Sequence, residues 1–159
     1  MLTYIYRLLI ELTNNRFVST TLKRFAQSRY SSFIVHSFAS IYKINQEEME
    51  GTLDNFKTLH SFFIRKLKAG NRPIDQAENS IVSPVDAVFE KYGPISETNI
   101  IEVKAKPYSV GEMLGNDKVL QKYIGGTFVL LYLSPSHYHR IHSPTTGVIT
   151  NQWTLGTNS

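Results

Sequence analysis

Three of the chain's five histidines lie within six residues, in the sequence LSPSHYHRIHSP. We call this stretch, residues 133–144, the histidine segment. It follows an apolar run and is bounded by prolines, so it is predicted to form a loop at a strand end, where functional groups are often displayed.

Three interpretations of the histidine segment stay open. His137, His139 and His142 could hold a metal, because a His-x-His spacing puts two imidazoles on one face of a strand. They could instead transfer protons, since histidine titrates near neutral pH. The third interpretation is a solvated polar loop without chemistry.

Asp86 is a second candidate, in the sequence SPVDA of residues 83–87. In an ordinary turn such a carboxylate caps nearby backbone amides. A carboxylate that orients a histidine is also part of the triad that activates a serine nucleophile. Both interpretations of Asp86 stay open on spacing alone.

The composition excludes several kinds of site. The 159 residues are 42% hydrophobic, enough for one folded domain, and they include no cysteine. Disulfides, thiol nucleophiles, iron–sulfur clusters and cysteine zinc sites are therefore excluded. The longest strongly apolar run, residues 128–133, is far shorter than the roughly 20 residues that cross a bilayer. The first residues do not resemble a signal peptide, so we expect a protein on the cytosolic side.

The positive charge is concentrated at the start of the chain. Residues 1–45 contain six lysines and arginines against one glutamate, whereas the remainder is slightly acidic. Such asymmetry favours contact with nucleic acid or with an anionic membrane. No RNA-binding aromatic motif is present, so a nucleic-acid partner is not expected. The basic helices are predicted either to pack on the core or to insert partly into a membrane interface.

Periodicity predicts the elements that position the candidate residues. Helices are expected at residues 5–12, 17–29 and 34–41, from Asn45 to Gly51, after a Thr58 cap, and at 110–114 after a Ser109 cap; strands are expected at 81–82, 85–92, 100–103, 127–133 and 148–155. The predicted fold class is α+β, with N-terminal amphipathic helices followed by a mainly antiparallel β core that is incomplete at the C-terminus. We expect a single domain over residues 1–159, in which residues 1–69 are mostly helical and face a membrane. Residues 70–159 are mostly β and carry the catalytic Asp and His residues.

Four stretches together resemble the phosphatidylserine decarboxylases. They are LHSFFIRKL at 59–67, NRPI at 71–74, SPVD at 83–86 and YLSPSHYHRIHSP at 132–144. Their order and approximate spacing match the family, and YRLLIELT at 6–13 resembles its Bacillus-like branch. The Tyr-His-Arg-x-His-x-Pro pattern is the most specific of these features.

The resemblance implies an enzyme that makes its own cofactor. In this family a serine near the C-terminus attacks the preceding peptide bond, and the cleaved small subunit then begins with a pyruvoyl group. Asp86 and His142 would be the orienting carboxylate and the general base of this cleavage, and His139 would assist decarboxylation or reprotonation. Arg140 would be structural or would help to hold an anionic headgroup.

The resemblance also implies partners and a location. They are phosphatidylserine in an anionic membrane, the enzyme's own C-terminal small subunit and a second copy in a homodimer, at the cytoplasmic face of the bacterial cell membrane. The attachment would be peripheral, and the product phosphatidylethanolamine.

Two departures from the family pattern matter. Ala87 stands where the family usually has glycine, which would be costly if the position required a positive φ. The Gly-Ser cleavage motif is expected well beyond the histidine segment, and Gly156 is followed by Thr157. We therefore expect the N-terminal part of a proenzyme, with the pyruvoyl-forming serine beyond Ser159. The alternatives are a non-catalytic membrane-binding homologue or partner subunit, and a metal protein that uses His137, His139 and His142.

Overall fold

The computed structural model describes residues 16–96, 100–103, 106–115, 117–150 and 152. They belong to two compact units. The first combines Met1–Asp86 with Leu133–Thr146, and the second combines Ala87–Tyr132 with Gly147–Ser159. The single domain expected from the sequence stays a prediction, and each unit is described by itself.

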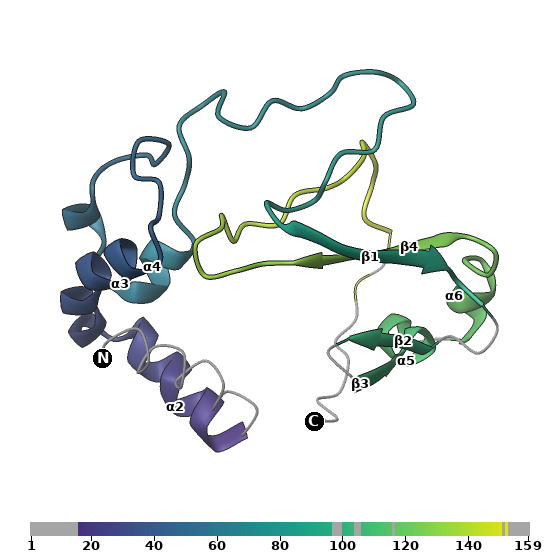
Figure 1. The fold of residues 1–159 in the computed structure, drawn as a ribbon, viewed down its shortest axis with the longest axis horizontal. Helices are drawn as coiled ribbons and strands as arrows, with labels where there is room; N and C mark the ends of the chain where they lie inside the picture. The colour runs from purple at the N-terminus through teal and green to yellow at the C-terminus, as the bar shows by residue number, and fades with distance from the viewer. Residues whose placement is uncertain (1–15, 97–99, 104–105, 116, 151, 153–159) are drawn as a thin grey trace. The chain divides into compact units, whose positions relative to one another are not determined.

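The first unit is built of short helices (Figure 1). They are α2 (Arg16–Gln27), η2 (Arg29–Ile34), α3 (Val35–Ile41), η3 (Leu53–Asn55) and α4 (Leu59–Phe63). Its core contains Val35, Phe38, Ala39, Ile44, Met49 and Phe62. The Phe38 ring meets the Phe62 ring edge to face, with centroids 6.3 Å apart. The apolar positions predicted at residues 34–41 therefore pack in the core.

Helix α4 begins where the sequence predicts. The Thr58 hydroxyl accepts a hydrogen bond from the Ser61 backbone N–H at 2.9 Å, which confirms the expected cap. Leu67 lies beyond the end of this helix and forms an isolated antiparallel bridge with Met49.

The helix expected from Asn45 to Gly51 is wrong. Its residues form turns, and their backbone pairs with a distant stretch: Glu50 N–H donates to Lys66 C=O at 3.0 Å, and Lys68 N–H donates to Glu48 C=O at 2.8 Å. This nonlocal pairing supplies the partners that a helix would have provided locally.

Helix α2 is amphipathic but only partly packed. Lys23 and Arg24 are exposed, Leu22 is half-buried, and Phe17 is 80% exposed. The helix predicted at residues 5–12 lies outside the described residues. No helix in the described ranges is both long enough and apolar enough to cross a membrane.

The second unit contains the strands. Antiparallel pairs join β1 (Val88–Pro94) to β4 (Thr127–Tyr132) and β2 (Ile100–Val103) to β3 (Lys106–Ser109), and two short helices follow β3, α5 (Val110–Leu114) and α6 (Asp117–Gln121). Helices together with antiparallel strands confirm the α+β class. Within the described part of the chain the strands form two separate two-stranded sheets.

Half of the elements in the second unit, β2, α5 and β4, lie where the sequence predicts to within one residue. Strand β2 is confirmed, β4 ends one residue early, and the Ser109 hydroxyl caps α5 by accepting from Glu112 N–H at 3.3 Å. Strand β1 starts three residues late because residues 84–86 bend. Strand β3 and helix α6 were not expected from the residue pattern. The strand predicted at residues 81–82, in the first unit, is absent, and residues 148–150 and 152 are not in a strand; the rest of the strand predicted at 148–155 lies outside the described residues.

Ser31 provides a test of how the helices are joined. Its buried hydroxyl accepts a hydrogen bond from Leu59 N–H at 2.8 Å and connects η2 to the start of α4. We expect Ser31→Ala to lower the free energy of unfolding by about 1–3 kcal/mol, because a donor in this core loses its partner. Urea denaturation of the complete protein followed by circular dichroism measures the change.

Ser40→Ala, at an exposed position of α3, is the matched control. It should change the unfolding free energy by less than about 0.5 kcal/mol. Equal effects of the two substitutions would contradict the role given to Ser31.

Candidate active site

Two arginines connect the histidine segment to the residues after α4, one from each side of the contact. Arg65, which is 4% exposed, donates from Nη2 to the carbonyl oxygens of Ser136 at 3.2 Å and His137 at 3.1 Å. Arg140, from the segment itself, donates from Nε to the Ile64 carbonyl at 2.9 Å. These bonds hold the backbone of the segment against residues 64–65.

Burial shapes the properties of Arg65. Its guanidinium lies over the Phe62 ring, 5.3 Å from the centroid, which favours the cation. Its Nε and Nη1 atoms are buried without a hydrogen-bond partner among the described residues. Desolvation lowers the pKa of Arg65, and the nearby carboxylates of Asp86 and Glu48 oppose that shift.

His139 is half-buried and packs against an aromatic ring. Its ring packs on Phe63 with centroids 3.9 Å apart, and its Nε2 lies 2.9 Å from the Ser134 carbonyl oxygen. A carbonyl only accepts, so Nε2 carries the hydrogen and Nδ1 of the neutral ring keeps its lone pair. Burial lowers the pKa of His139; the Ser134 hydrogen bond opposes this, and the positive charge of Arg65 adds to it.

The other two imidazoles have different surroundings. His137 Nδ1 accepts a hydrogen bond from the Ser134 backbone N–H at 3.1 Å. His142 is exposed, and its ring stacks on Tyr138 with its Nε2 atom 3.3 Å from the Tyr138 hydroxyl. His139 and His142 therefore occupy distinct environments within one short segment.

Asp86 is held by Arg72. Arg72 Nε lies 2.9 and 2.8 Å from the two carboxylate oxygens, and its Nη2 donates to both Asp86 and Glu48, the latter at 2.9 Å. The hydrogen bond to Asp86 is the main reason why the pKa of Arg72 is raised above its ordinary value. Paired, bidentate contacts of this kind define the orientation of a carboxylate.

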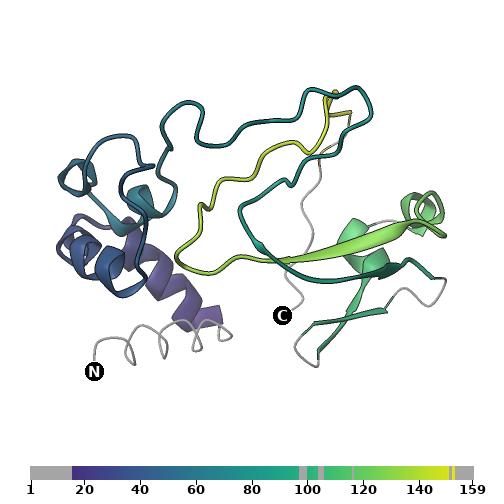
Figure 2. The ribbon, with the colours of Figure 1, turned by 45° about the horizontal axis from the view of Figure 1, so that its top comes forward.

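A short backbone pairing brings the Asp86 stretch beside the His142 stretch. Val82 N–H donates to Pro144 C=O at 3.0 Å, and His142 N–H donates to Pro84 C=O at 2.8 Å, so the two stretches run antiparallel (Figure 2). No hydrogen bond links Asp86 to His142 within the described ranges, where Asp86 bonds to Arg72. The catalytic roles of Asp86, His139 and His142 stay predictions.

Ala87 shows none of the strain that its replacement of glycine could bring. Of the described non-glycine residues, Lys43 alone has a positive φ. Alanine is therefore compatible with this backbone.

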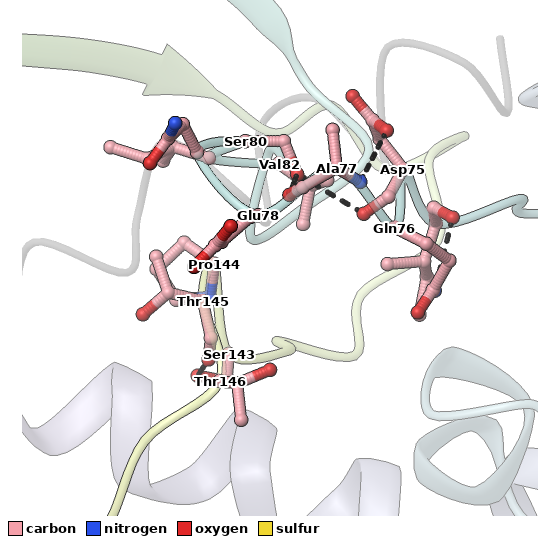
Figure 3. A pocket seen from close by; sticks show the side chains of 13 residues that line it. Asp75, Gln76, Ala77, Glu78, Ser80, Val82, Ser143, Pro144, Thr145 and Thr146 are labelled. Carbon is pink, nitrogen blue, oxygen red and sulfur yellow. Dashed lines mark hydrogen bonds between the residues drawn. The ribbon is translucent and has the colours of Figure 1, made fainter.

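What the histidine segment can bind depends on its possible metal ligands and on a pocket that its last residues help to line. No three His, Asp or Glu side chains of the described residues are grouped so that they could hold a metal ion. A pocket of about 740 Å³ is lined by residues 74–82 and 143–146, and the second of these ranges begins directly after His142 (Figure 3). Asp75 and Glu78 line it, but none of the predicted site residues does.

Sequence reasoning gave no role to Arg65 or Arg72, which appeared only inside the family-like motifs. One signal could have identified Arg65. It directly follows three apolar residues, so its position in the chain favours burial. A buried charged residue needs hydrogen-bonding or charged partners, which makes such a residue a candidate for holding other segments in place. No comparable signal exists for Arg72, whose partners lie 14 and 24 residues away.

Comparisons with known proteins support the resemblance. A family model described as phosphatidylserine decarboxylase matches residues 59–157. Phosphatidylserine decarboxylase proenzymes from Geobacillus sp. (strain WCH70) and Bacillus anthracis (strain A0248) are 57% and 56% identical over 159 and 155 residues. These alignments cover 100% and 98% of this chain but only 61% and 59% of the relatives, so the chain spans about three fifths of their length.

The charge of Arg65 provides a test at His139. Replacing Arg65 by methionine keeps an apolar stem but removes the positive charge and both carbonyl contacts. We expect Arg65→Met to raise the pKa of His139 towards the ordinary histidine value, because a lowering charge is lost and the segment is held less tightly. NMR titration of the His139 ring in the complete protein measures this shift.

Lys66→Met, which removes an exposed neighbouring charge, is the control and should leave the His139 titration unchanged. A His139 pKa that stays the same or falls in Arg65→Met would contradict the assignment.

Proposed function

Because this chain belongs to the phosphatidylserine decarboxylase family, we propose that its gene product is a self-cleaving, pyruvoyl-dependent enzyme that converts phosphatidylserine to phosphatidylethanolamine and carbon dioxide. The observation that carries this proposal is the hydrogen bond from His142 N–H to Pro84 C=O. This hydrogen bond brings the histidine segment beside the bend that contains Asp86. A carboxylate and an imidazole on adjacent segments are the pair that serine activation requires.

Self-cleavage needs a base at the serine hydroxyl. In the proposed sequence His142 accepts the hydroxyl proton, the serine oxygen attacks the preceding carbonyl carbon, and the peptide C–N bond breaks as its nitrogen is protonated. Loss of the serine α-proton then expels the ester carboxylate and cuts the chain. Water replaces the nitrogen, which leaves as ammonia. Asp86 orients the His142 ring for the first transfer.

The residues present suit the group that this cleavage would form. The pyruvoyl ketone, once formed, supplies an electrophile for the substrate's amine and an electron sink for decarboxylation. The depressed pKa of His139 favours the neutral imidazole near neutral pH, with its free lone pair on Nδ1. We assign to that atom two proton transfers: Nδ1 first accepts a proton from the substrate's ammonium group, which must be deprotonated to react with the ketone, and then donates that proton to the carbon that has lost the carboxylate.

Arg140 is given a structural role first. Its Nε is already bonded to the Ile64 carbonyl, which ties the histidine segment to the residue after α4. Arg140 directly follows His139 in the sequence, and its other guanidinium nitrogens are proposed to contact the phosphate or carboxylate of the headgroup.

Helix α2 supports attachment to a bilayer. It combines exposed Lys23 and Arg24 with the exposed Phe17 ring, the composition of an interfacial helix. We assign the enzyme to the cytoplasmic face of the cell membrane as a peripheral protein, where its substrate is itself an anionic lipid. The processed small subunit and a second copy complete the proposed assembly.

Intact-mass spectrometry of the complete product, expressed from its native gene, tests self-cleavage. The wild type should give a large chain and a small chain whose N-terminus carries a ketone in place of an amine. Asp86→Asn and His142→Gln should stay uncut or slow by a factor of about 10³–10⁴, because loss of a member of such a triad removes most of the activation.

An exposed pair elsewhere in the unit provides matched controls. His36 and Asp54 are hydrogen-bonded at 2.9 Å on the surface. His36→Gln and Asp54→Asn should cleave like the wild type. A wild-type product that remains one chain would overturn the decarboxylase proposal, and cleavage of both site variants at the normal rate would overturn the residue roles.

Vesicle sedimentation tests the role of α2. We expect Lys23→Gln combined with Arg24→Gln to weaken binding to phosphatidylserine vesicles by about 30-fold at low salt, since each basic residue near the surface contributes about 1 kcal/mol. The control pair Lys91→Gln and Lys122→Gln, exposed in the second unit, should bind like the wild type. Equal wild-type binding to neutral and anionic vesicles would refute the electrostatic contribution.

A further inference from the structure

Arg72 joins two carboxylates that are far apart in the sequence. Its Nε and Nη2 atoms engage Asp86, and Nη2 also donates to Glu48 Oε2 at 2.9 Å. The remaining nitrogen, Nη1, donates to the Asn71 carbonyl at 2.7 Å. All three nitrogens are therefore bonded, so the plane of the guanidinium is defined from three sides.

Asp86 itself has little local support. It lies in the bend of residues 84–86, after the two backbone bonds of the Val82 to Pro84 stretch and before strand β1. Within the described residues its carboxylate is bonded only by Arg72. The orientation of this carboxylate therefore depends on the Arg72 side chain, and Arg72 is oriented by Glu48 and the Asn71 carbonyl.

The contact with Arg72 leaves acceptor capacity on Asp86. An ionised carboxylate offers about four acceptor sites, and the guanidinium occupies only part of them. The remaining lone pairs can receive an imidazole N–H. The hydrogen bond from His142 N–H to Pro84 C=O brings the two stretches together, and His142 is the histidine of the stretch that pairs with residues 82–84.

We propose that Arg72 is a positioning residue for self-cleavage: its two-pronged contact fixes the Asp86 carboxylate in the orientation from which Asp86 serves His142. This inference rests on the proposed function and adds to it a residue that touches neither the serine nor the substrate. The planar guanidinium matches the two oxygens of a carboxylate, whereas a lysine ammonium acts as a single point charge.

The test follows the rate of self-cleavage of the complete gene product after synthesis in a cell-free system. Arg72→Ala should slow cleavage by roughly tenfold to 100-fold, the order of loss that a misplacement of about 1 Å produces. Arg72→Lys should fall between Arg72→Ala and the wild type, because it keeps the charge but loses the paired geometry. Lys66→Ala, which removes an exposed positive charge close by, should cleave at the wild-type rate.

Chemical rescue separates positioning from a general loss of structure. Low, non-denaturing guanidinium chloride should restore part of the cleavage rate of Arg72→Ala, whereas sodium chloride at equal ionic strength should not. Glu48→Gln should slow cleavage less than Arg72→Ala, because Arg72 keeps its direct contact with Asp86.

Several results would overturn the proposal. Arg72→Ala that cleaves at the wild-type rate or faster would mean that Arg72 is dispensable or restrains Asp86. Arg72→Lys at the full wild-type rate would show that charge alone suffices. If Arg72→Ala has a lower melting temperature than the wild type, the cleavage rate of Arg72→Lys becomes the deciding measurement. A wild-type rate for Arg72→Lys then overturns the proposal. A wild type that stays uncut would overturn the proposed function and this inference with it, whereas normal wild-type cleavage with unaffected Arg72 variants would overturn this inference alone.

Discussion

Burial of the Arg65 guanidinium between α4 and the histidine segment is the interaction on which the candidate site depends. Burying a cation costs several kcal/mol, and here two carbonyl oxygens and the Phe62 ring offset part of that cost. Two of its nitrogens have no partner within the described residues, so the arrangement is not optimal for stability alone. Its effect is to fix the backbone at residues 136–137, where the cluster of imidazoles begins.

Arg65 and Arg72 have different electrostatic effects on the site. Arg65 is buried, and its charge adds to the effect of burial in lowering the His139 pKa, which favours the neutral ring. Arg72 is partly exposed and pairs with carboxylates, which leaves Asp86 oriented beside the His142 stretch. One segment thus presents an enclosed neutral imidazole and an exposed one, and such separation of environments is how titratable groups acquire different roles.

Local sequence signals succeeded where the deciding interactions are local. Thr58 and Ser109 cap their helices because a hydroxyl next to the first free N–H groups needs no distant partner. The Asn45 to Gly51 prediction failed because the backbone of Glu48 and Glu50 bonds to a stretch some 16 to 20 residues later. Capping patterns involve only nearby residues, so they do not indicate that distant backbone groups compete for these hydrogen bonds.

Residue spacing and periodicity suffice to predict the α+β class, the amphipathic helices and the clustering of His137, His139 and His142, because they are properties of neighbours in the chain. The motifs also sufficed to identify the family. Three features of the site become visible only in the folded chain: Arg65 is buried, Arg72 holds Asp86, and His139 carries its hydrogen on Nε2. Each of these depends on a partner or a degree of burial that folding supplies, and the physical reason is the same: hydrogen bonding and desolvation are set by which groups meet in space.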